Sequence, residues 1–442
     1  MRRINYKTLF HVLFGLFLIS LPFSKGINSV TYVGLLLLSL GGLFTRKVSP
    51  PSYLTKKLLP IGLLFGLLVV SCLYSEDKET GLAVLRSQSK MLGIPLLIAF
   101  NTDLIQKQYH RYLFILIRSV VIAACITLLF FFLPESFVQK IATTTRYLQD
   151  YIPHEKKYAF GAYSPFIDRL QFSYLIVLAF FLECWCTFQL APPKKFPYLP
   201  INFHTSILLI TLIIIGARGA QLGFVVGLGI WMMGIYLKYG HPTMASRFGN
   251  ALSYLLLIGG LGLTTIVLPY IAYKTIPTLQ ERYDQLIWEI GTYQDGTIQK
   301  YDYTHFTSIR RWLSWQHSWE LIQQQPLLGT GIGDYKKELG QTYAKDQLKV
   351  PVNTQSQFLY YGVSSGIMAL LTFLGLWGYW LFQGFQQNHY WKKVLFLSIF
   401  FFYILVLLFD APLNFKVGAM TFWLIYALLL IKEEILSFSI AP

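Results

Sequence analysis

Long apolar runs separated by short polar stretches dominate the chain. Runs of roughly 17–25 apolar residues are long enough to cross the hydrocarbon core of a bilayer as a helix. We place twelve runs at residues 7–23, 28–45, 58–75, 83–100, 112–133, 168–190, 203–217, 219–237, 251–272, 358–384, 393–410 and 414–431. The pattern predicts an all-α polytopic membrane protein with about twelve transmembrane helices. Runs 203–217 and 219–237 are nearly continuous, and we expect a break at Gly216-Ala217-Arg218-Gly219 because one helix would be too long for the bilayer.

One large polar segment interrupts this pattern before the tenth run. Residues 273–357, here called the polar loop, divide the chain into 1–272 with nine spans, the loop itself, and 358–442 with three spans. Chemistry on a polar substrate needs a wet surface, and this loop is the largest polar segment available. A second polar segment, Leu133–Ile167, could cover or line the same site.

The polar loop is predicted to be mostly helical. Its main helix spans 308–324, with Ser308 as a plausible N-cap and Pro326 as a stop. Trp312, Trp319 and Ile322 are available for burial on this helix. A turn that only small residues allow follows at Gly329, Gly331 and Gly333. A second helix is expected at Asp334–Asp346.

Composition and charge agree with a membrane protein. Apolar residues make up 54% of the chain and charged residues 13%, about half of the roughly 25% that soluble proteins carry. The net charge of +16 is spread along the chain, whereas the polar loop balances nine Lys/Arg against nine Asp/Glu. We attribute the positive charge to membrane orientation and to contact with membrane lipids, and expect no nucleic-acid partner.

The lysines and arginines of the short loops set the expected orientation, because cytoplasmic loops are enriched in these residues. Basic residues fall in every second loop, at Arg2, Arg3, Lys7, Arg46, Lys47, Lys56, Lys57, Lys107, Arg111, Lys194, Lys195, Lys238, Arg247, Lys392, Lys393 and Lys432. Both termini are then cytoplasmic, and the Arg218 turn and the polar loop face outward. The first run is followed by no small-residue cleavage site, so we interpret it as an uncleaved signal anchor.

Cysteine usage points to packing. Cys72, Cys125, Cys184 and Cys186 all lie inside predicted spans. They cannot form an extracytoplasmic disulfide framework, and the Cys184-x-Cys186 spacing does not suit zinc.

Arginines are the leading candidates for substrate binding. Ionisable residues at membrane depth are costly and are functional by default. Arg218 lies between two apolar runs, flanked by glycines that let a large group approach the backbone, and its guanidinium can hold phosphate in a bidentate fork. The alternative is an arginine that reaches up to the lipid headgroups. Arg310 and Arg311 open the Trp-rich helix and can bind an anion, or can be a solvated helix start.

Other ionisable residues are weaker candidates. Arg86 and Lys90 stand at i, i+4, and either line a polar cavity or mark an interfacial helix. His317 is either a base or a polar packing residue. Acidic residues inside spans are few, with Glu183 and, at an outer edge, Asp410. This shortage counts against a proton-coupled transporter, which needs a relay of carboxylates or histidines.

These motifs, in this order and topology, resemble the O-antigen ligase/polymerase family of bacterial envelope glycosyltransferases. The resemblance rests on Ala217–Ala220, Arg311–Trp315, Pro326–Gly331 and Asn353–Leu359, followed by Gly366. It implies transfer of a glycan from an undecaprenyl-diphosphate carrier to an acceptor on the periplasmic side of the inner membrane. It also implies a metal-independent reaction without a cofactor, in which Arg218 and Arg311 hold the diphosphate.

The sequence departs from the family at one position. Ligases usually carry a histidine in the stretch before span ten, where this chain reads Thr354-Gln355-Ser356-Gln357. A carboxamide cannot accept a proton at neutral pH, although it can hydrogen-bond an incoming hydroxyl. The base is therefore elsewhere, with His317 the nearest candidate by motif, or little base assistance is needed. A third option is that the chain is a polymerase or a divergent member of the family.

Three functions remain open from sequence. The first is a ligase whose acceptor is the lipid A–core. The second is a polymerase of the same family, whose acceptor is another glycan repeat. The third is a lipid-linked oligosaccharide flippase or other transporter, which a two-fold relation between the halves of the chain would favour.

Overall fold

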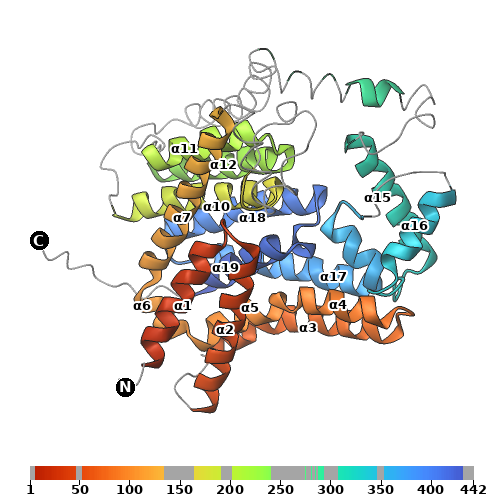
Figure 1. Ribbon diagram of the computed structural model, residues 1–442, viewed down its shortest axis with the longest axis horizontal. Coiled ribbons are helices and arrows are strands. Elements are labelled where there is room, and N and C mark those ends of the chain that lie inside the picture. The colour runs from red at the N-terminus through yellow and green to blue at the C-terminus, as the bar shows by residue number, and fades with distance from the viewer. Residues whose placement is uncertain are drawn as a thin grey trace, which may run out of the picture.

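The computed structural model describes residues 5–45, 52–133, 164–190, 202–239, 307–345 and 353–431, together with positions 274, 280, 284 and 287–292. Every regular element in this part of the chain is helical (Figure 1). The helices are α1 (Tyr6–Ser20), α2 (Lys25–Phe44), α3 (Ser52–Tyr74), α4 (Lys78–Gln88), α5 (Lys90–Phe100), α6 (Thr102–Lys107), α7 (Tyr109–Phe132), α10 (Arg169–Leu190), α11 (Phe203–Ile215), α12 (Arg218–Tyr239), α15 (Thr307–Gln324), α16 (Tyr335–Lys345), α17 (Gln357–Phe385), α18 (Tyr390–Phe409), η3 (Pro412–Asn414) and α19 (Lys416–Leu430).

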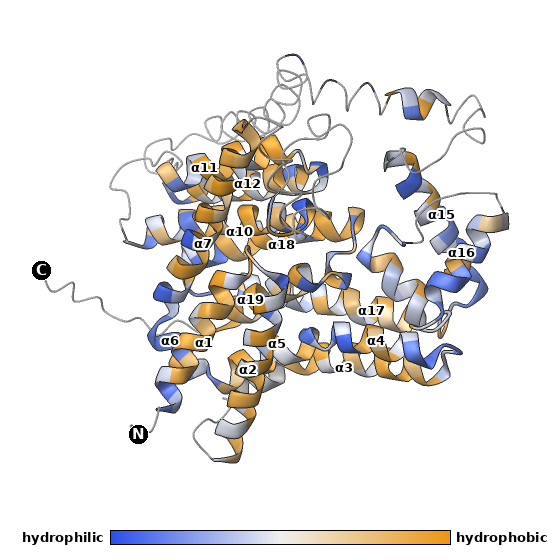
Figure 2. Ribbon diagram, in the orientation of Figure 1, coloured by the Kyte–Doolittle hydropathy of each residue, from blue (hydrophilic) through white to orange (hydrophobic). Residues whose placement is uncertain are grey.

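The prediction of an all-α polytopic membrane protein is confirmed. Eight helices within the described residues are long and apolar enough to span a membrane, and α1, α11 and α19 are shorter apolar helices. These correspond to eleven of the twelve expected runs, whereas run 251–272 lies outside the described residues. Most of the second polar segment, 134–163, also lies outside them. The bundle helices are hydrophobic, and α15 and α16 are the polar elements beside them (Figure 2).

The break between α11 and α12 falls where the sequence predicts it. Gly216 caps α11 in the left-handed conformation, with φ 63°, which glycine adopts without steric cost. The Gln221 side chain donates hydrogen bonds to the carbonyls of Leu212 (3.1 Å) and Ile213 (3.3 Å). The chain therefore turns sharply, and Arg218 opens the next helix.

Helices α12 and α18 pack antiparallel through small residues. A Cβ atom at Gly223 would lie 2.8 Å from the Phe402 ring, and one at Gly227 would lie 2.9 Å from the Ser398 carbonyl oxygen. Glycines let helix backbones approach closely in a membrane. This register brings Arg218, at the start of α12, near the last turn of α18. We call this end of the bundle, where α18 ends at Phe409, the loop end.

Helix α17 is broken at Gly366, and the turn after α15 fills the break. Gly366 has φ 74° and ψ −175° inside the helix. The backbone N–H groups of Thr330 and Gly331 donate to the carbonyls of Val363 (2.8 Å) and Ser364 (3.1 Å), and the Ile367 N–H donates to the Pro326 carbonyl (2.7 Å). Backbone groups freed inside an apolar bundle need such partners. The polar loop is thus tied to a membrane helix through backbone bonds.

The glycine turn also docks on the connection between α3 and α4. The Asp334 carboxylate accepts the backbone N–H groups of Glu76 (2.7 Å) and Asp77 (3.0 Å). The hydroxyls of Ser71 and Ser75 accept the N–H groups of Ile332 and Gly333. Gly329 and Gly331 have positive φ, which confirms the prediction of a structural turn.

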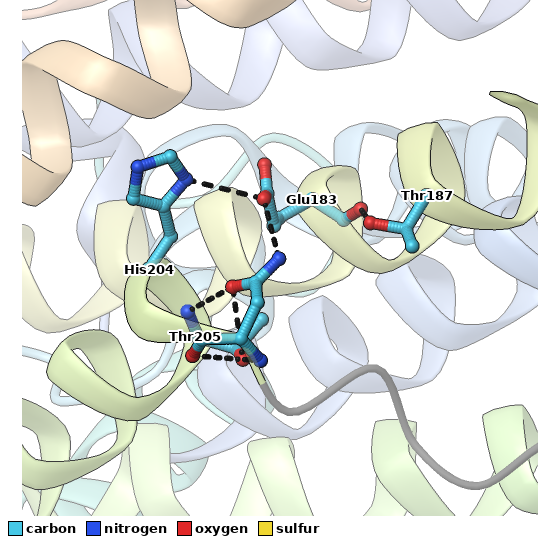
Figure 3. A network of polar contacts seen from close by, with 5 residues as sticks. Glu183, Thr187, His204 and Thr205 are labelled. Atoms are coloured by element: carbon cyan, nitrogen blue, oxygen red, sulfur yellow. Dashed lines mark hydrogen bonds and ion pairs between the residues drawn. The ribbon is translucent and has the colours of Figure 1, made fainter. Parts of the chain in front are cut away.

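A buried carboxylate ties α10 to α11 at the opposite end of the bundle. Glu183 Oε1 accepts from the Asn202 amide (2.9 Å) and lies 3.2 Å from His204 Nδ1 (Figure 3). Asn202 in turn forms a capping box with Thr205 at the start of α11. The four cysteines lie in α3, α7 and α10, and Cys72, Cys184 and Cys186 are buried.

We expect Glu183→Ala to destabilise the bundle by about 1 kcal/mol, because it leaves the partly buried Asn202 amide and His204 imidazole without their acceptor. Thermal unfolding in detergent measures the change. Glu183→Gln, which keeps an acceptor oxygen, should cost less and serves as the control. An unchanged unfolding temperature in Glu183→Ala would contradict the structural role of this network.

Candidate functional site

Helix α15 turns a different face inward from the one the sequence predicts. Trp312 and Trp319 are 56% and 51% exposed, so the expectation that both are available for burial is wrong. The buried face consists of Ile309, Leu313, Ser314, His317, Ser318, Leu321 and Ile322. Ser308 is not the N-cap, since α15 already includes Thr307 and the Ser308 N–H donates to the Glu289 carboxylate (2.9 Å).

The segment 353–357 is clamped between α15 and the loop end of α18. The Ser314 hydroxyl donates to the Asn353 carbonyl, and the Trp315 indole N–H donates to the Gln355 carbonyl (3.1 Å). On the other side, the Ser356 hydroxyl donates to the Leu407 carbonyl (3.3 Å). The segment therefore has one fixed position at the end of α18.

Gln355 has a strained backbone within this segment. Its φ is 50°, the only positive φ of a non-glycine residue in the described part of the chain. This conformation costs of order 1–2 kcal/mol and often marks functional positions. The side chain is 9% exposed and makes no hydrogen bond within the described residues. Its carboxamide is available to a ligand.

Gln357 fixes the turn that follows α18. Its N–H donates to the Asp410 carbonyl (3.1 Å). Its side-chain oxygen accepts the Leu413 N–H (3.1 Å), and its side-chain nitrogen donates to Asn414 Oδ1 (3.3 Å). No local sequence pattern pointed to this role, because Gln357 is more than fifty positions away from Leu413 and Asn414.

Asp410 and Tyr174 form a buried polar pair at the loop end. The Tyr174 hydroxyl donates to Asp410 Oδ2 (2.6 Å), and the Ala411 N–H donates to Oδ1 (2.8 Å). Burial raises the pKa of the Asp410 carboxyl, while these two hydrogen bonds and the nearby Arg311 charge act in the opposite direction. The sequence pointed to Asp410 only as a rare acid at a span edge and did not point to Tyr174.

Arg311 and Arg310 act on different neighbours. Arg311 interacts electrostatically with Asp410 and Tyr174 but forms no hydrogen bond or ion pair within the described residues. Burial and the adjacent Arg311 charge lower the pKa of Arg310, while the nearby Glu289 carboxylate acts in the opposite direction. Arg311 is therefore the arginine of α15 that acts on the loop end of α18.

Arg218 occupies the first position of α12, partly exposed. A Cβ atom at Gly219 would meet no atom of the described residues within 4 Å, so they leave the backbone there open to approach. The N-terminus of a helix also presents unpaired N–H groups and a positive dipole end to an anion. The structure brings Arg218 to the same end of the bundle as Arg311 and Gln355.

The remaining sequence candidates, His317, Arg86 and Lys90, lie on α15, α4 and α5. His317 is 2% exposed, with Nδ1 3.1 Å from Glu320 Oε2 and its ring 5.3 Å from that of Tyr343. Arg86 is exposed, whereas Lys90 is buried and its amine donates to the Ser87 carbonyl (2.6 Å). The run that holds them is split between α4 and α5.

A cavity of about 350 Å³ adjoins the clamped segment at Asn353. It lies between α4, α16, α17 and the η3–α19 turn. The lining residues are Thr80, Ala83, Val84, Ser87, Gln88, Tyr335, Lys336, Asn353, Tyr360, Asn414 and Phe415. Across the described residues, no cluster of three or more His, Cys, Asp and Glu side chains could hold a metal ion.

Comparison with known families matches residues 204–374 to the family model described as O-antigen ligase. The match runs from α11 through the Arg218 turn and the polar loop into α17. It confirms the resemblance drawn from the motifs. A comparison with curated protein sequences gives no match.

Proposed function

Because residues 204–374 carry an O-antigen ligase domain, we propose that this chain transfers a glycan from undecaprenyl diphosphate to a hydroxyl of a lipid A–core acceptor. The reaction takes place at the loop end, on the periplasmic side of the bacterial inner membrane. The observation that carries the proposal is the environment of the Arg311 guanidinium. It is a partly buried guanidinium with no hydrogen bond or ion pair in the described protein, close to the buried Asp410.

The arginines bind the donor in this proposal. When the bond between the sugar carbon and the diphosphate oxygen breaks, negative charge grows on the leaving diphosphate. Fixed guanidiniums at Arg218 and Arg311, together with the N-terminus of α12, stabilise that charge more in the transition state than in the ground state. No step requires a metal ion or a cofactor.

Gln355 and Asp410 act on the acceptor. The Gln355 carboxamide hydrogen-bonds the incoming hydroxyl, and its strained, clamped backbone holds it in place. As the new glycosidic bond forms, the hydroxyl proton passes to the Asp410 carboxylate. A carboxyl whose pKa is raised by burial is a better proton acceptor than an ordinary one. His317 packs between α15 and α16, which supports a structural role.

A polymerase would use the same donor site and differ only in its acceptor. The test is therefore transfer of a lipid-linked glycan by the purified protein in nanodiscs, with lipid A–core and a glycan repeat offered in parallel. Product on lipid A–core alone supports a ligase. Product on the glycan repeat alone would show that the protein is a polymerase and not a ligase. No transfer to either acceptor, with folded protein and intact donor, would refute the proposal.

Gln355 substitutions separate the roles of its side chain and backbone. Gln355→Gly accepts the positive φ but lacks the carboxamide, so we expect undiminished stability and about 5- to 10-fold slower transfer, as for one lost hydrogen bond of about 1 kcal/mol. Gln355→His should be tolerated, since imidazole titrates near neutral pH. His317→Ala, the control, should lower the unfolding temperature without slowing transfer. A wild-type transfer rate in Gln355→Gly would show that the Gln355 side chain does not act at the reacting centre.

A further inference from the structure

The cavity beside the clamped segment has the chemistry of a carbohydrate site. Its wall combines the amides of Gln88, Asn353 and Asn414 with hydroxyls and the aromatic rings of Tyr335 and Phe415. The volume of about 350 Å³ falls at the lower end of the range for small-molecule sites, roughly 300–1,000 Å³. Phe415, 41% exposed, offers an aromatic surface at the wall of the cavity.

The amides of the wall have unused hydrogen-bonding capacity. The Gln88 and Gln357 side-chain nitrogens both donate to Asn414 Oδ1, at 3.0 and 3.3 Å. Gln88 is 2% exposed, and its Oε1 and the Asn414 Nδ2 are buried with no hydrogen-bond partner among the described residues. The Tyr360 hydroxyl lies near the Gln88 amide but outside hydrogen-bonding geometry. A buried acceptor and a buried donor side by side suit a sugar hydroxyl, which both donates and accepts.

The charge around the cavity is positive. Lys336 lines it, and among the described residues no carboxylate does. Two further lysines stand beside the cavity wall and near each other, Lys90 and Lys416. The Lys90 amine donates to the carbonyl of the lining residue Ser87. Lys416 directly follows the lining residue Phe415. Neither Lys90 nor Lys416 forms an ion pair within the described residues. Two acids beside lining residues are already engaged: the Asp77 carboxylate accepts the Thr80 N–H (2.9 Å) and hydroxyl (2.6 Å), and the Asp334 carboxylate accepts two backbone N–H groups. Such a site favours a sugar that carries a carboxylate or phosphate.

One short segment of the chain joins the wall of the cavity to the proposed reacting centre. Asn353 lines the cavity, and Gln355 lies two residues further along the clamped segment. Gln357 joins that segment to Asn414 in the opposite wall. A sugar bound against Asn353 would therefore lie two residues along the chain from Gln355.

We propose that this cavity is the acceptor subsite and that it selects an acidic sugar. The inference rests on the proposed glycan transfer for its role, but the binding of the sugar itself does not depend on it. Lys336 would contact the anionic group, and Gln88 and Asn414 would hold a ring hydroxyl.

Direct binding tests the subsite independently of catalysis. The probes are an oligosaccharide ending in glucuronic acid, its neutral glucose counterpart and glucose 6-phosphate, titrated against the full-length protein in nanodiscs of neutral lipid. We expect the glucuronic acid probe to bind about 10-fold more tightly than the neutral one, as for one charged hydrogen bond. Glucose 6-phosphate binding more tightly still would assign the anionic group as phosphate. Equal affinity for the acidic and neutral probes would overturn the proposal.

Two lysine variants provide the matched comparison. Lys336→Gln should abolish the preference for the acidic probe. Lys337→Gln, which removes a neighbouring lysine whose partner is the exposed Glu76 (3.1 Å), should keep it. Loss of the preference in both variants, or in neither, contradicts the assignment. Displacement of the probe by phosphatidylglycerol vesicles would instead identify a lipid headgroup site and would also overturn it.

Transfer assays then separate this inference from the proposed function. With an acidic acceptor, Lys336→Gln should raise KM for the acceptor about 10-fold and leave kcat and the donor KM unchanged. If the probes bind as expected but wild-type protein transfers no glycan, the proposed function fails and the subsite stands. If transfer occurs with equal KM in Lys336→Gln and wild type, the subsite fails and the function stands.

Discussion

Arg311→Lys is expected to slow glycan transfer by roughly 10²–10³-fold, the loss seen when one charged contact is removed from a reacting centre. Lysine keeps the positive charge but cannot form the two parallel hydrogen bonds of a guanidinium on a phosphate. Protein amount in the membrane should stay normal, because Arg311 forms no hydrogen bond or ion pair in the described structure. The measurement is initial transfer rate with purified variants at matched concentration.

The control for this experiment is Arg111→Lys. Arg111 lies near the start of α7, is exposed, and contacts Gln108, so its replacement should leave transfer unchanged. Arg218→Lys should slow transfer by about as much as Arg311→Lys. The double variant should lose less activity than the two single fold-reductions in rate multiplied together, because both arginines serve one diphosphate. A wild-type rate in Arg311→Ala would rule out Arg311 as a diphosphate ligand.

Gly366→Ala is expected to detach the polar loop from α17. The added Cβ would lie 2.1 Å from the Leu327 carbonyl oxygen, and the φ and ψ of Gly366 belong to a region open essentially to glycine alone. We expect a loss of about 3 kcal/mol or more and little remaining transfer. Gly375→Ala, in the same helix with nothing within 4 Å of the new Cβ, should behave as wild type.

Limited proteolysis distinguishes loop release from general unfolding in Gly366→Ala. Cleavage should appear first in residues 326–334, while the bundle helices stay protected. Equal protection of the loop in Gly366→Ala and Gly375→Ala would show that the break in α17 is not required.

The sequence predicted the membrane helices well because lipid allows few alternatives: an apolar run of sufficient length must be a helix. The break at Gly216 was predictable for the same reason, since the combined run exceeds the bilayer. The break at Gly366 was not, because a glycine inside an apolar run looks the same whether it packs, bends or breaks the helix.

The candidate site was only partly predictable. Arg218 and Arg311 stood out as charges in unusual places, and the structure brings both to the loop end. The face of α15 was misjudged because apolar residues lie all around it, and only the docking partner decides that Trp312 is exposed and Leu313 buried. The Tyr174–Asp410 pair joins residues 236 positions apart, a contact that no local pattern encodes.

The docking of the glycine turn has a consequence for the order in which the protein assembles. Its backbone bonds reach Val363 and Ser364, later in the chain, and its side-chain contacts reach Ser71 and Ser75, which precede it by about 260 residues. Contacts so distant in sequence form slowly, after local helices. During synthesis the polar loop emerges before α17 exists, so its turn acquires its binding partners only once α17 has been inserted. Under the proposed function, transfer would therefore begin only after α17 is in place, and an incomplete chain would not act on the lipid-linked donor.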